Sequence, residues 1–260
     1  MPPTPRSSTR RAALCLTFDN MGRAREIGEG LASRPDEDEP GLAVGYPRIL
    51  HLLDELGLKA TFFIEGWNAL HHPHHVEKLA RSGHEVGLHG WVHEKFGSLD
   101  KARAAQLLYD GTVAMERIGL RPRGFRAPGA LRGEHTIPVL HELDYRYDSS
   151  TDPRDHSTQP ALLAPGLAHV PWREEMVDSI QYLRHPVRPR TPQEMEALWR
   201  EGIDRAATAG ETVTMVAHAF VSGVDDARFE ALQNVLRYAG DRVDVVTALE
   251  AANKVLGGNR

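Results

Sequence analysis

The sequence predicts an α/β fold in which parallel strands close into a distorted (β/α)7 barrel, built as a single domain. Short apolar runs rich in β-branched and aromatic residues alternate with longer segments of helical periodicity. This alternation is typical of repeated βα units around a parallel sheet. A chain of 260 residues is long enough for one such barrel with a buried interior.

The strands are expected where apolar runs are bounded by polar or turn-forming residues. Seven runs meet this description, and seven strands suit a barrel better than an open sheet. They are residues 13–18, 60–64, 85–88, 124–126, 145–148, 168–171 and 212–217.

The helices are expected between these strands, in segments that begin near Ser, Thr, Asp or Pro and mostly end at Gly. They are residues 46–56, 74–82, 100–119, 136–143, 192–209 and 227–240. Two polar loops, residues 35–40 and 152–160, separate other elements. Residues 1–11 are polar and rich in Pro, Ser and Arg, so we expect a disordered tail before a domain over residues 12–255.

Composition excludes several classes of protein. The formal net charge of −5 provides no positive field for a phosphate backbone, so nucleic acid is not an expected partner. The single cysteine, Cys15, lies in an apolar strand, where a buried structural role is expected rather than a nucleophile. The first apolar run is too short for a signal segment or a membrane span, so the expected location is cytoplasmic, away from membranes.

Polar residues that can act as acids, bases or metal ligands follow the predicted strands, at the face where parallel α/β barrels build their active sites. These candidates are Asp19 and Asn20, His89 and His93, Arg126, Asp148, Trp172 and His218. Their convergence on one end of the barrel predicts a catalytic site there.

His89 and His93 are four residues apart after the third strand, a spacing that lets two imidazoles bind one cation. Divalent zinc is the expected ion, and a pair of surface histidines is the alternative. Arg126 could hold Asp19 through its forked guanidinium or make only a structural salt bridge. His218 suits a general acid, although a buried core histidine has the same pattern.

Other histidines are expected to be structural. Residues 71–75 read His-His-Pro-His-His, and the proline predicts a turn into a helix from which the side chains diverge. A solvated helix start is therefore expected there, with a second metal site as the alternative. His84 precedes the third strand and belongs to the opposite end of the barrel.

Several segments together resemble the polysaccharide deacetylases, also called the NodB-homology family or carbohydrate esterase family 4, in a branch near allantoinase-like and cyclic-imidase-like members. Residues 17–20 (Thr-Phe-Asp-Asn) resemble the family's Thr-Phe-Asp-Asp motif, and residues 83–93 resemble its histidine motif. Weaker similarities occur at residues 126–129, 147–150 and 215–218.

The resemblance implies a role for each matching residue. Asp19 would be the general base, His218 the general acid, and Arg126 the partner that orients Asp19. His89 and His93 would bind a divalent metal, Zn²⁺ by default. Asn20 would complete the metal triad, although the commonest family pattern has aspartate there and an amide oxygen is a weaker, neutral ligand. The alternative is that Asp19 itself moves onto the metal and leaves another residue as the base.

Four further residues are candidates for substrate binding. Trp172 could stack on a sugar face or lie buried in the core. Asp148 and Glu175 gain importance if Asn20 alters the triad, and Pro128 lies in the motif that begins at Arg126.

The function that follows is metal-dependent hydrolysis of a carbon–nitrogen bond, as an N-deacetylase acting on a soluble sugar-like or specialised-metabolite substrate. Ring-opening of a cyclic amide or ureide is the first alternative, and an inactive carbohydrate-binding barrel is the second. The expected partner is a small-molecule or oligosaccharide amide, and a homo-oligomer stays open.

Overall fold

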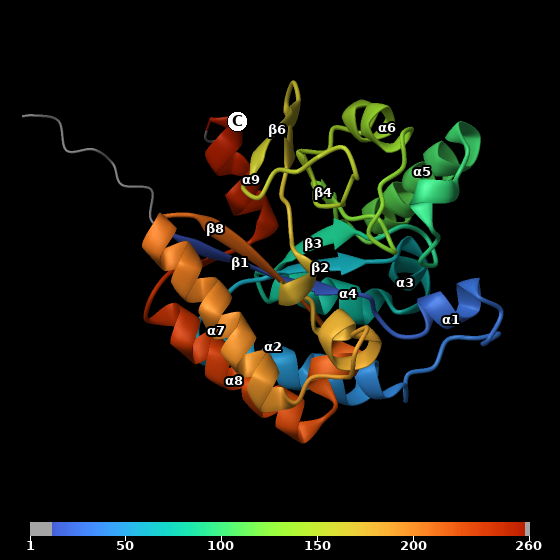
Figure 1. Ribbon diagram of the computed structural model, residues 1–260. Coiled ribbons are helices and arrows are strands. Elements are labelled where there is room, and N and C mark those ends of the chain that lie inside the picture. Colours follow the sequence, from blue (N-terminus) through green and yellow to red (C-terminus); the bar gives the residue numbers. More distant parts are fainter. Residues whose placement is uncertain (1–11, 258–260) are drawn as a thin grey trace, which may run out of the picture.

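The computed structural model describes residues 12–257 and has a mixed sheet of nine strands at its centre (Figure 1). The strands run in the order β6-β7-β5-β4-β3-β2-β1-β8, and β9 pairs with β1 beside β2. Their bounds are Ala13–Asp19 (β1), Thr61–Ile64 (β2), Glu85–Leu88 (β3), Gly124–Phe125 (β4), Tyr147–Asp148 (β5), Ala161–Ala164 (β6), Leu167–His169 (β7), Thr212–His218 (β8) and Asp244–Val246 (β9).

The sheet curls into the distorted barrel that the sequence predicts. All strand pairs are parallel except β6 with β7, which form an antiparallel hairpin at the edge. The opposite edge, β8, meets the segment after β7 through a bridge between Val177 and Val216. The Thr214 hydroxyl also donates to the Pro171 carbonyl at 2.7 Å. Closure therefore depends on a few contacts at this seam rather than on a continuous strand ladder.

The seven predicted strands are confirmed, with ends that differ by one or two residues. Sequence reasoning missed β6 and β9, which are short and carry little periodicity. Strand β9 pairs with the first half of β1, whereas β2 pairs with its second half, so β1 is covered on both edges. Every residue of β1 is buried, as expected for a central strand between the barrel interior and the outer helices.

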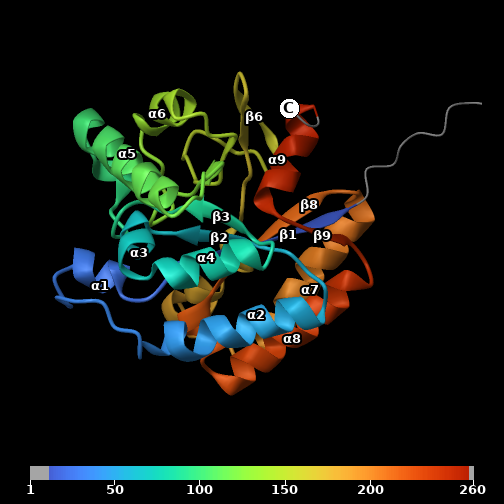
Figure 2. The same ribbon diagram turned by 180° about the vertical axis from the view of Figure 1, so that it is seen from behind.

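The six predicted helices are also present, and three short ones were missed. Figures 1 and 2 both show α7 and α8 side by side on one flank, with α5 on the other. The helices are Ala24–Gly28 (α1), Tyr46–Glu55 (α2), Gly66–His71 (α3), Pro73–Arg81 (α4), Lys101–Arg117 (α5), Thr136–Glu142 (α6), Pro192–Ala209 (α7), Asp226–Gly240 (α8) and Ala248–Leu256 (α9).

Local sequence explains why the long helix α7 has the bounds it has. Thr191 accepts a hydrogen bond from the backbone of Glu194, and the Glu194 side chain accepts one from the Thr191 backbone, which forms a capping box. At the other end Gly210 adopts a left-handed conformation with φ 68°. Helix α9 has the same kind of capping box at Thr247 and Glu250.

Cys15 and His84, which the sequence predicts to be structural, are both buried in the core. Cys15 is fully buried in β1, and burial raises the pKa of its thiol to about 12, which leaves it unreactive at neutral pH. His84 packs its ring edge against Phe62, and burial lowers the pKa of its imidazole to about 4. Both side chains contribute packing rather than chemistry.

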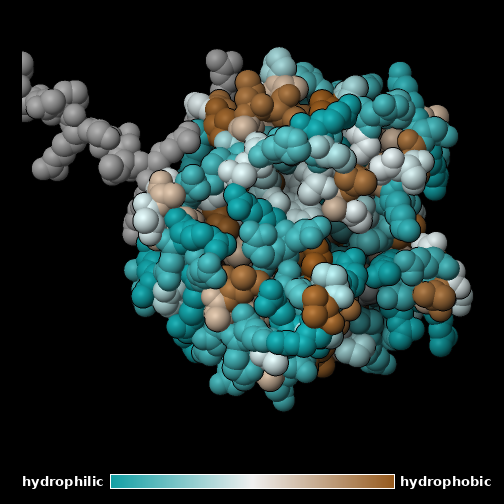
Figure 3. All heavy atoms as spheres, in the orientation of Figure 1, coloured by the Kyte–Doolittle hydropathy of each residue, from teal (hydrophilic) through white to brown (hydrophobic). Residues whose placement is uncertain are grey.

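The predicted tail, residues 1–11, lies outside the described residues, and the domain bounds 12–255 stay a prediction. Within residues 12–257, no helix combines the length and the apolar character that crossing a membrane requires. The face shown in Figure 3 is mostly hydrophilic, with hydrophobic residues in separate groups, one of them near β6 and α9.

Candidate active site

A cavity of about 630 Å³ opens at the carboxyl ends of the central strands. It brings together most of the predicted site residues, because the ends of parallel strands meet at one face of the sheet. The predicted residues that line it are Asp19, Asn20, His89, His93, Arg126, Trp172 and His218. The rim adds apolar side chains, among them Ile180, Leu183 and Phe220.

Asp19 and Arg126 form a buried ion pair at the base of the cavity. Arg126 Nη1 donates to Asp19 Oδ1 at 2.7 Å and to Thr17 Oγ1 at 2.8 Å. Its Nη2 donates to Ser149 Oγ at 2.9 Å, and its guanidinium lies 4.3 Å from the Phe63 ring centroid. The predicted pairing of the two residues is therefore present, and it leaves Asp19 Oδ2 available to the cavity.

His89 is oriented by the backbone of the neighbouring strand. Its Nδ1 donates to the Arg126 carbonyl at 2.8 Å, which leaves Nε2 as the lone-pair nitrogen. Burial lowers the pKa of the imidazole to about 3, so the ring is neutral at pH 7. A neutral imidazole with a fixed tautomer is the form that binds a metal.

His93 converges with His89 from the other end of a tight turn. The two ring centroids are 5.2 Å apart and nearly perpendicular, and burial lowers the pKa of His93 to about 3 as well. The backbone of His93 is left-handed, with φ 74°, and that of Gly90 has φ 71°. Glu94 fixes this turn by accepting two backbone hydrogen bonds, so the pair sits on a turn rather than on a regular helix.

Asn20 is held by a buried carboxylate that sequence reasoning missed. Its Nδ2 donates to Glu65 Oε1 at 2.8 Å, while the Met21 backbone and Asn68 Nδ2 donate to Glu65 Oε2. Glu65 is fully buried, and burial raises the pKa of its carboxyl to about 8. Because Nδ2 is engaged with Glu65, the Asn20 amide oxygen is the atom left for a ligand.

The left-handed backbone of Asn20, with φ 67°, is a conformation that Asn tolerates better than most residues. Left-handed residues at Asn20 and His93 place two strained positions beside one cavity, as is common at functional sites.

His218 ends β8 and is oriented by a second missed residue, Asp178. His218 Nδ1 contacts Asp178 Oδ1 at 2.6 Å, and the His218 backbone donates to Asp178 Oδ2 at 2.8 Å. Ser222 donates to the same Oδ2 at 2.7 Å. Asp178 therefore occupies Nδ1 of the imidazole and leaves Nε2 for chemistry.

The four predicted substrate-binding residues divide into two groups. Trp172 lines the cavity and is fixed by a hydrogen bond from its Nε1 to the Ser149 carbonyl at 2.8 Å. Pro128 is buried behind the lining and packs toward Gly90.

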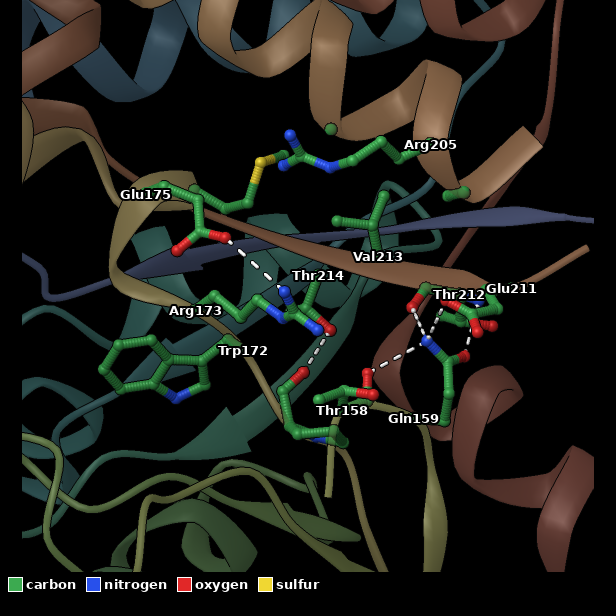
Figure 4. Close-up of a pocket in the computed structure, with 14 residues that line it drawn as sticks. Thr158, Gln159, Trp172, Arg173, Glu175, Arg205, Glu211, Thr212, Val213 and Thr214 are labelled. Carbon is green, nitrogen blue, oxygen red and sulfur yellow. Dashed lines mark hydrogen bonds and ion pairs between the residues drawn. The ribbon is translucent and has the colours of Figure 1, made fainter. Parts of the chain in front are cut away.

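Asp148 and Glu175 do not reach this cavity. Asp148 is fully buried and bound by Arg132 Nη1 at 2.9 Å and by Ser150 Oγ at 2.5 Å, so its oxygens are occupied. Glu175 lies on the turn Glu174–Met176 (η3) and lines a smaller neighbouring cavity, where its carboxylate faces Arg173 (Figure 4). Neither side chain lines this cavity, so their expected contact with substrate stays a prediction that the packing of the two side chains does not support.

The residues around His89 fit a divalent metal. His89 and His93 would supply two neutral imidazole nitrogens, and Asn20 would supply an amide oxygen. Two nitrogens and one oxygen would leave a coordination position open to solvent from the cavity. Three protein ligands with one open position are typical of a catalytic metal site rather than of a closed structural one.

The missed residues Glu65 and Asp178 carried weak signals in the sequence. Glu65 directly follows β2, at the same end of the sheet as Asp19. Asp178 lies in a segment with two other carboxylates, and nothing in the sequence says which of the three reaches His218.

Comparison with known proteins agrees with this fold. The family model for polysaccharide deacetylase matches residues 6–147, more than half of the chain. A peptidoglycan deacetylase-like protein of Gibberella zeae is 26% identical to this chain, and the alignment covers 95% of this chain and 87% of that protein. A peptidoglycan-N-acetylglucosamine deacetylase of Bacillus cereus is 25% identical over 74% of this chain and 82% of its own.

Solved structures show the same architecture. A candidate polysaccharide deacetylase from Mycobacterium smegmatis superposes with a TM-score of 0.81 at 27% identity, covering 97% of this chain and 93% of its own. The allantoinase Puue superposes with a TM-score of 0.76 at 20% identity over the same shares, which shows a common fold.

The fold and the comparisons together assign this chain to the deacetylase-like hydrolases built on a distorted α/β barrel. Within that class, this chain belongs to the polysaccharide deacetylase family.

Proposed function

We propose that this protein is a metal-dependent N-deacetylase that cleaves the amide bond of an N-acetylated, sugar-like molecule. The observation that carries the proposal is the convergence of a paired base, a paired acid and two neutral imidazoles on one cavity. A pure binding module needs none of these oriented pairs.

The chain's own residues would divide the reaction between them. Asp19, held by Arg126, would accept a proton from the attacking water as it adds to the amide carbonyl carbon. His218, held by Asp178, would deliver a proton to the leaving nitrogen as the carbon–nitrogen bond breaks. The products are acetate and a free amine, and the protons balance.

His89, His93 and Asn20 would hold the divalent ion, for which Zn²⁺ is the expected choice given the imidazole ligands. When bound, such an ion polarises the amide carbonyl and acidifies water at neutral pH.

The cavity supports a substrate of one or two sugar rings. Its volume of about 630 Å³ falls within the usual range for small-molecule sites. Trp172 and the rim residues Leu183 and Phe220 provide apolar surface above a polar base. Aromatic surface of this kind suits the apolar face of a sugar.

The test is a substrate screen with purified, metal-reconstituted protein. N-acetylglucosamine, its short oligomers and small cyclic ureides and imides are incubated with wild type and with His89→Ala/His93→Ala, and released acetate or ring-opened product is measured. We expect acetate release that the double variant loses. Ring opening alone would replace the proposal with the cyclic-amide reaction, and no turnover of any substrate would favour a binding role.

A further inference from the structure

A second group of convergent histidines lies outside the cavity, where α4 begins. Glu37, from the loop before Gly41–Gly45 (η1), contacts His72 Nδ1 at 2.7 Å through Oε1. Its Oε2 lies 2.9 Å from His75 Nε2 and 3.5 Å from His74 Nε2. The sequence predicts that the side chains of residues 71–75 diverge, and that expectation is wrong for these three histidines.

The convergence has a local cause. Helix α3 ends at His71, His72 has a non-helical backbone, and Pro73 starts α4. His74 and His75 therefore lie in the first turn of α4, with ring centroids 4.1 Å apart. Their rings meet the loop that carries Glu37, which brings together donors 37 and 38 residues apart in the chain.

We propose that Glu37, His74 and His75 form a second metal site, for a zinc-class divalent ion. The three ligand atoms are within 4.8 Å of one another. Tetrahedral zinc with ligands at about 2.1 Å places ligand atoms about 3.4 Å apart. Glu37 Oε2 lies 3.5 Å from His74 Nε2 and 2.9 Å from His75 Nε2, so small side-chain shifts would meet this geometry. One carboxylate oxygen and two imidazole nitrogens form a donor set that zinc accepts.

His72 acts as a support for this site rather than as a ligand. It is fully buried, and its Nδ1 donates to Glu37 Oε1, which directs the other carboxylate oxygen toward His74 and His75. A hydrogen bond of this kind fixes the direction of a coordinating side chain. Glu37 and His74 are exposed, so water has access to complete the coordination sphere.

The position of the site indicates a structural effect. An ion there would tie the loop between α1 and η1 to the start of α4. His72 is also one helical turn after Asn68, which donates to Glu65, and Glu65 holds Asn20. The tied segment therefore packs against the residues that support the catalytic cavity.

The test counts bound metal. Protein freed of any affinity tag is stripped with chelator, dialysed against zinc chloride and analysed for zinc per chain. The variants are His74→Ala/His75→Ala, His89→Ala/His93→Ala, the combination of both, and His71→Ala. His71 is the matched control, because it belongs to the same histidine run but stacks on Trp67 away from Glu37.

We expect two equivalents in wild type and in His71→Ala, one in each double variant and none in the combination. Glu37→Gln should weaken zinc binding at the second site at least 10-fold. Cobalt in place of zinc gives an independent visible-absorption readout of each site.

The proposal is overturned if His74→Ala/His75→Ala, shown to be folded by circular dichroism, binds as much zinc as wild type. It is also overturned if His71→Ala loses as much as that variant, since binding would then be unspecific. Failure of the catalytic site gives a different pattern, in which wild type holds one equivalent and His74→Ala/His75→Ala holds none.

Discussion

Two groups of histidines converge in this protein, and they differ in what holds them. His89 is buried and His93 is half-buried, and their orientation comes from the strand-end backbone and a turn closed by Glu94. His74 and His75 lie on the first turn of a helix and meet a carboxylate from an exposed loop.

The difference teaches what preorganisation requires. At the candidate site, each of three polar side chains has a buried partner that occupies one of its atoms and leaves the other free: Arg126 for Asp19, Asp178 for His218 and Glu65 for Asn20. At the surface group, only His72 plays that part. We therefore expect changes near the cavity to alter chemistry and changes at the surface group to alter local metal binding.

The largest effect should come from Asp19→Asn. An amide cannot accept the proton of the attacking water, and general-base catalysis contributes about 10²- to 10⁴-fold, so kcat should fall about 10³-fold. Steady-state acetate release measures this, with the exposed Asp38→Asn as control. Equal activity in Asp19→Asn and wild type would remove Asp19 from the mechanism.

A smaller effect is expected from Asp178→Asn, because Asp178 is a positioning residue that acts through His218. We expect kcat to fall about 10²-fold with little change in KM, and the basic limb of the pH–rate profile to move. Ser222→Ala, which removes one donor to Asp178, should give a smaller loss in the same direction. A change confined to KM, with kcat and the pH–rate profile unchanged, would argue against this role.

A third prediction concerns stability and explains why Asn stands at position 20. Asn20→Asp would place a carboxylate oxygen 2.8 Å from Glu65 Oε1, and above pH 8, where Glu65 is ionised, the two buried carboxylates would repel each other. We expect the free energy of unfolding of the metal-free protein to fall by about 1–3 kcal/mol. The measurement is urea denaturation of the apoprotein at pH 9, above the pKa of about 8 that burial gives Glu65.

The matched double variant Asn20→Asp/Glu65→Gln restores an amide opposite a carboxylate and should recover most of that stability. If Asn20→Asp alone is as stable as wild type, Glu65 does not restrict position 20.

The smallest effect at neutral pH is a titration difference. His89 and His93 have a pKa of about 3 when folded and about 6.5 when unfolded, so the unfolded state binds more protons between these values. Stability of the metal-free protein should therefore be unaffected above pH 7 and fall as the pH drops from 6.5 toward 3.

NMR titration of the histidine ring signals checks the same point. The two signals absent from His89→Ala and His93→Ala spectra should not shift between pH 8 and pH 5. Shifts with midpoints near 6.5 would show that the pair is solvated.

The sequence by itself determined the order of most strands and helices and most of the polar residues that line the cavity. Apolar alternation predicts β1, β2, β3 and β8, and capping residues predict the bounds of α7, because these signals depend on neighbours along the chain. Asp19, His89, His93, Arg126 and His218 were found because parallel strands carry their polar ends to one face.

Only the tertiary structure decided which partner each of these residues has. Glu65 reaches Asn20 across 45 residues of chain, and Asp178 reaches His218 across 40. Asp148, equally well placed in the sequence, turns instead to Arg132. Side-chain direction depends on how separate elements pack against one another, and no local pattern in the chain encodes that packing.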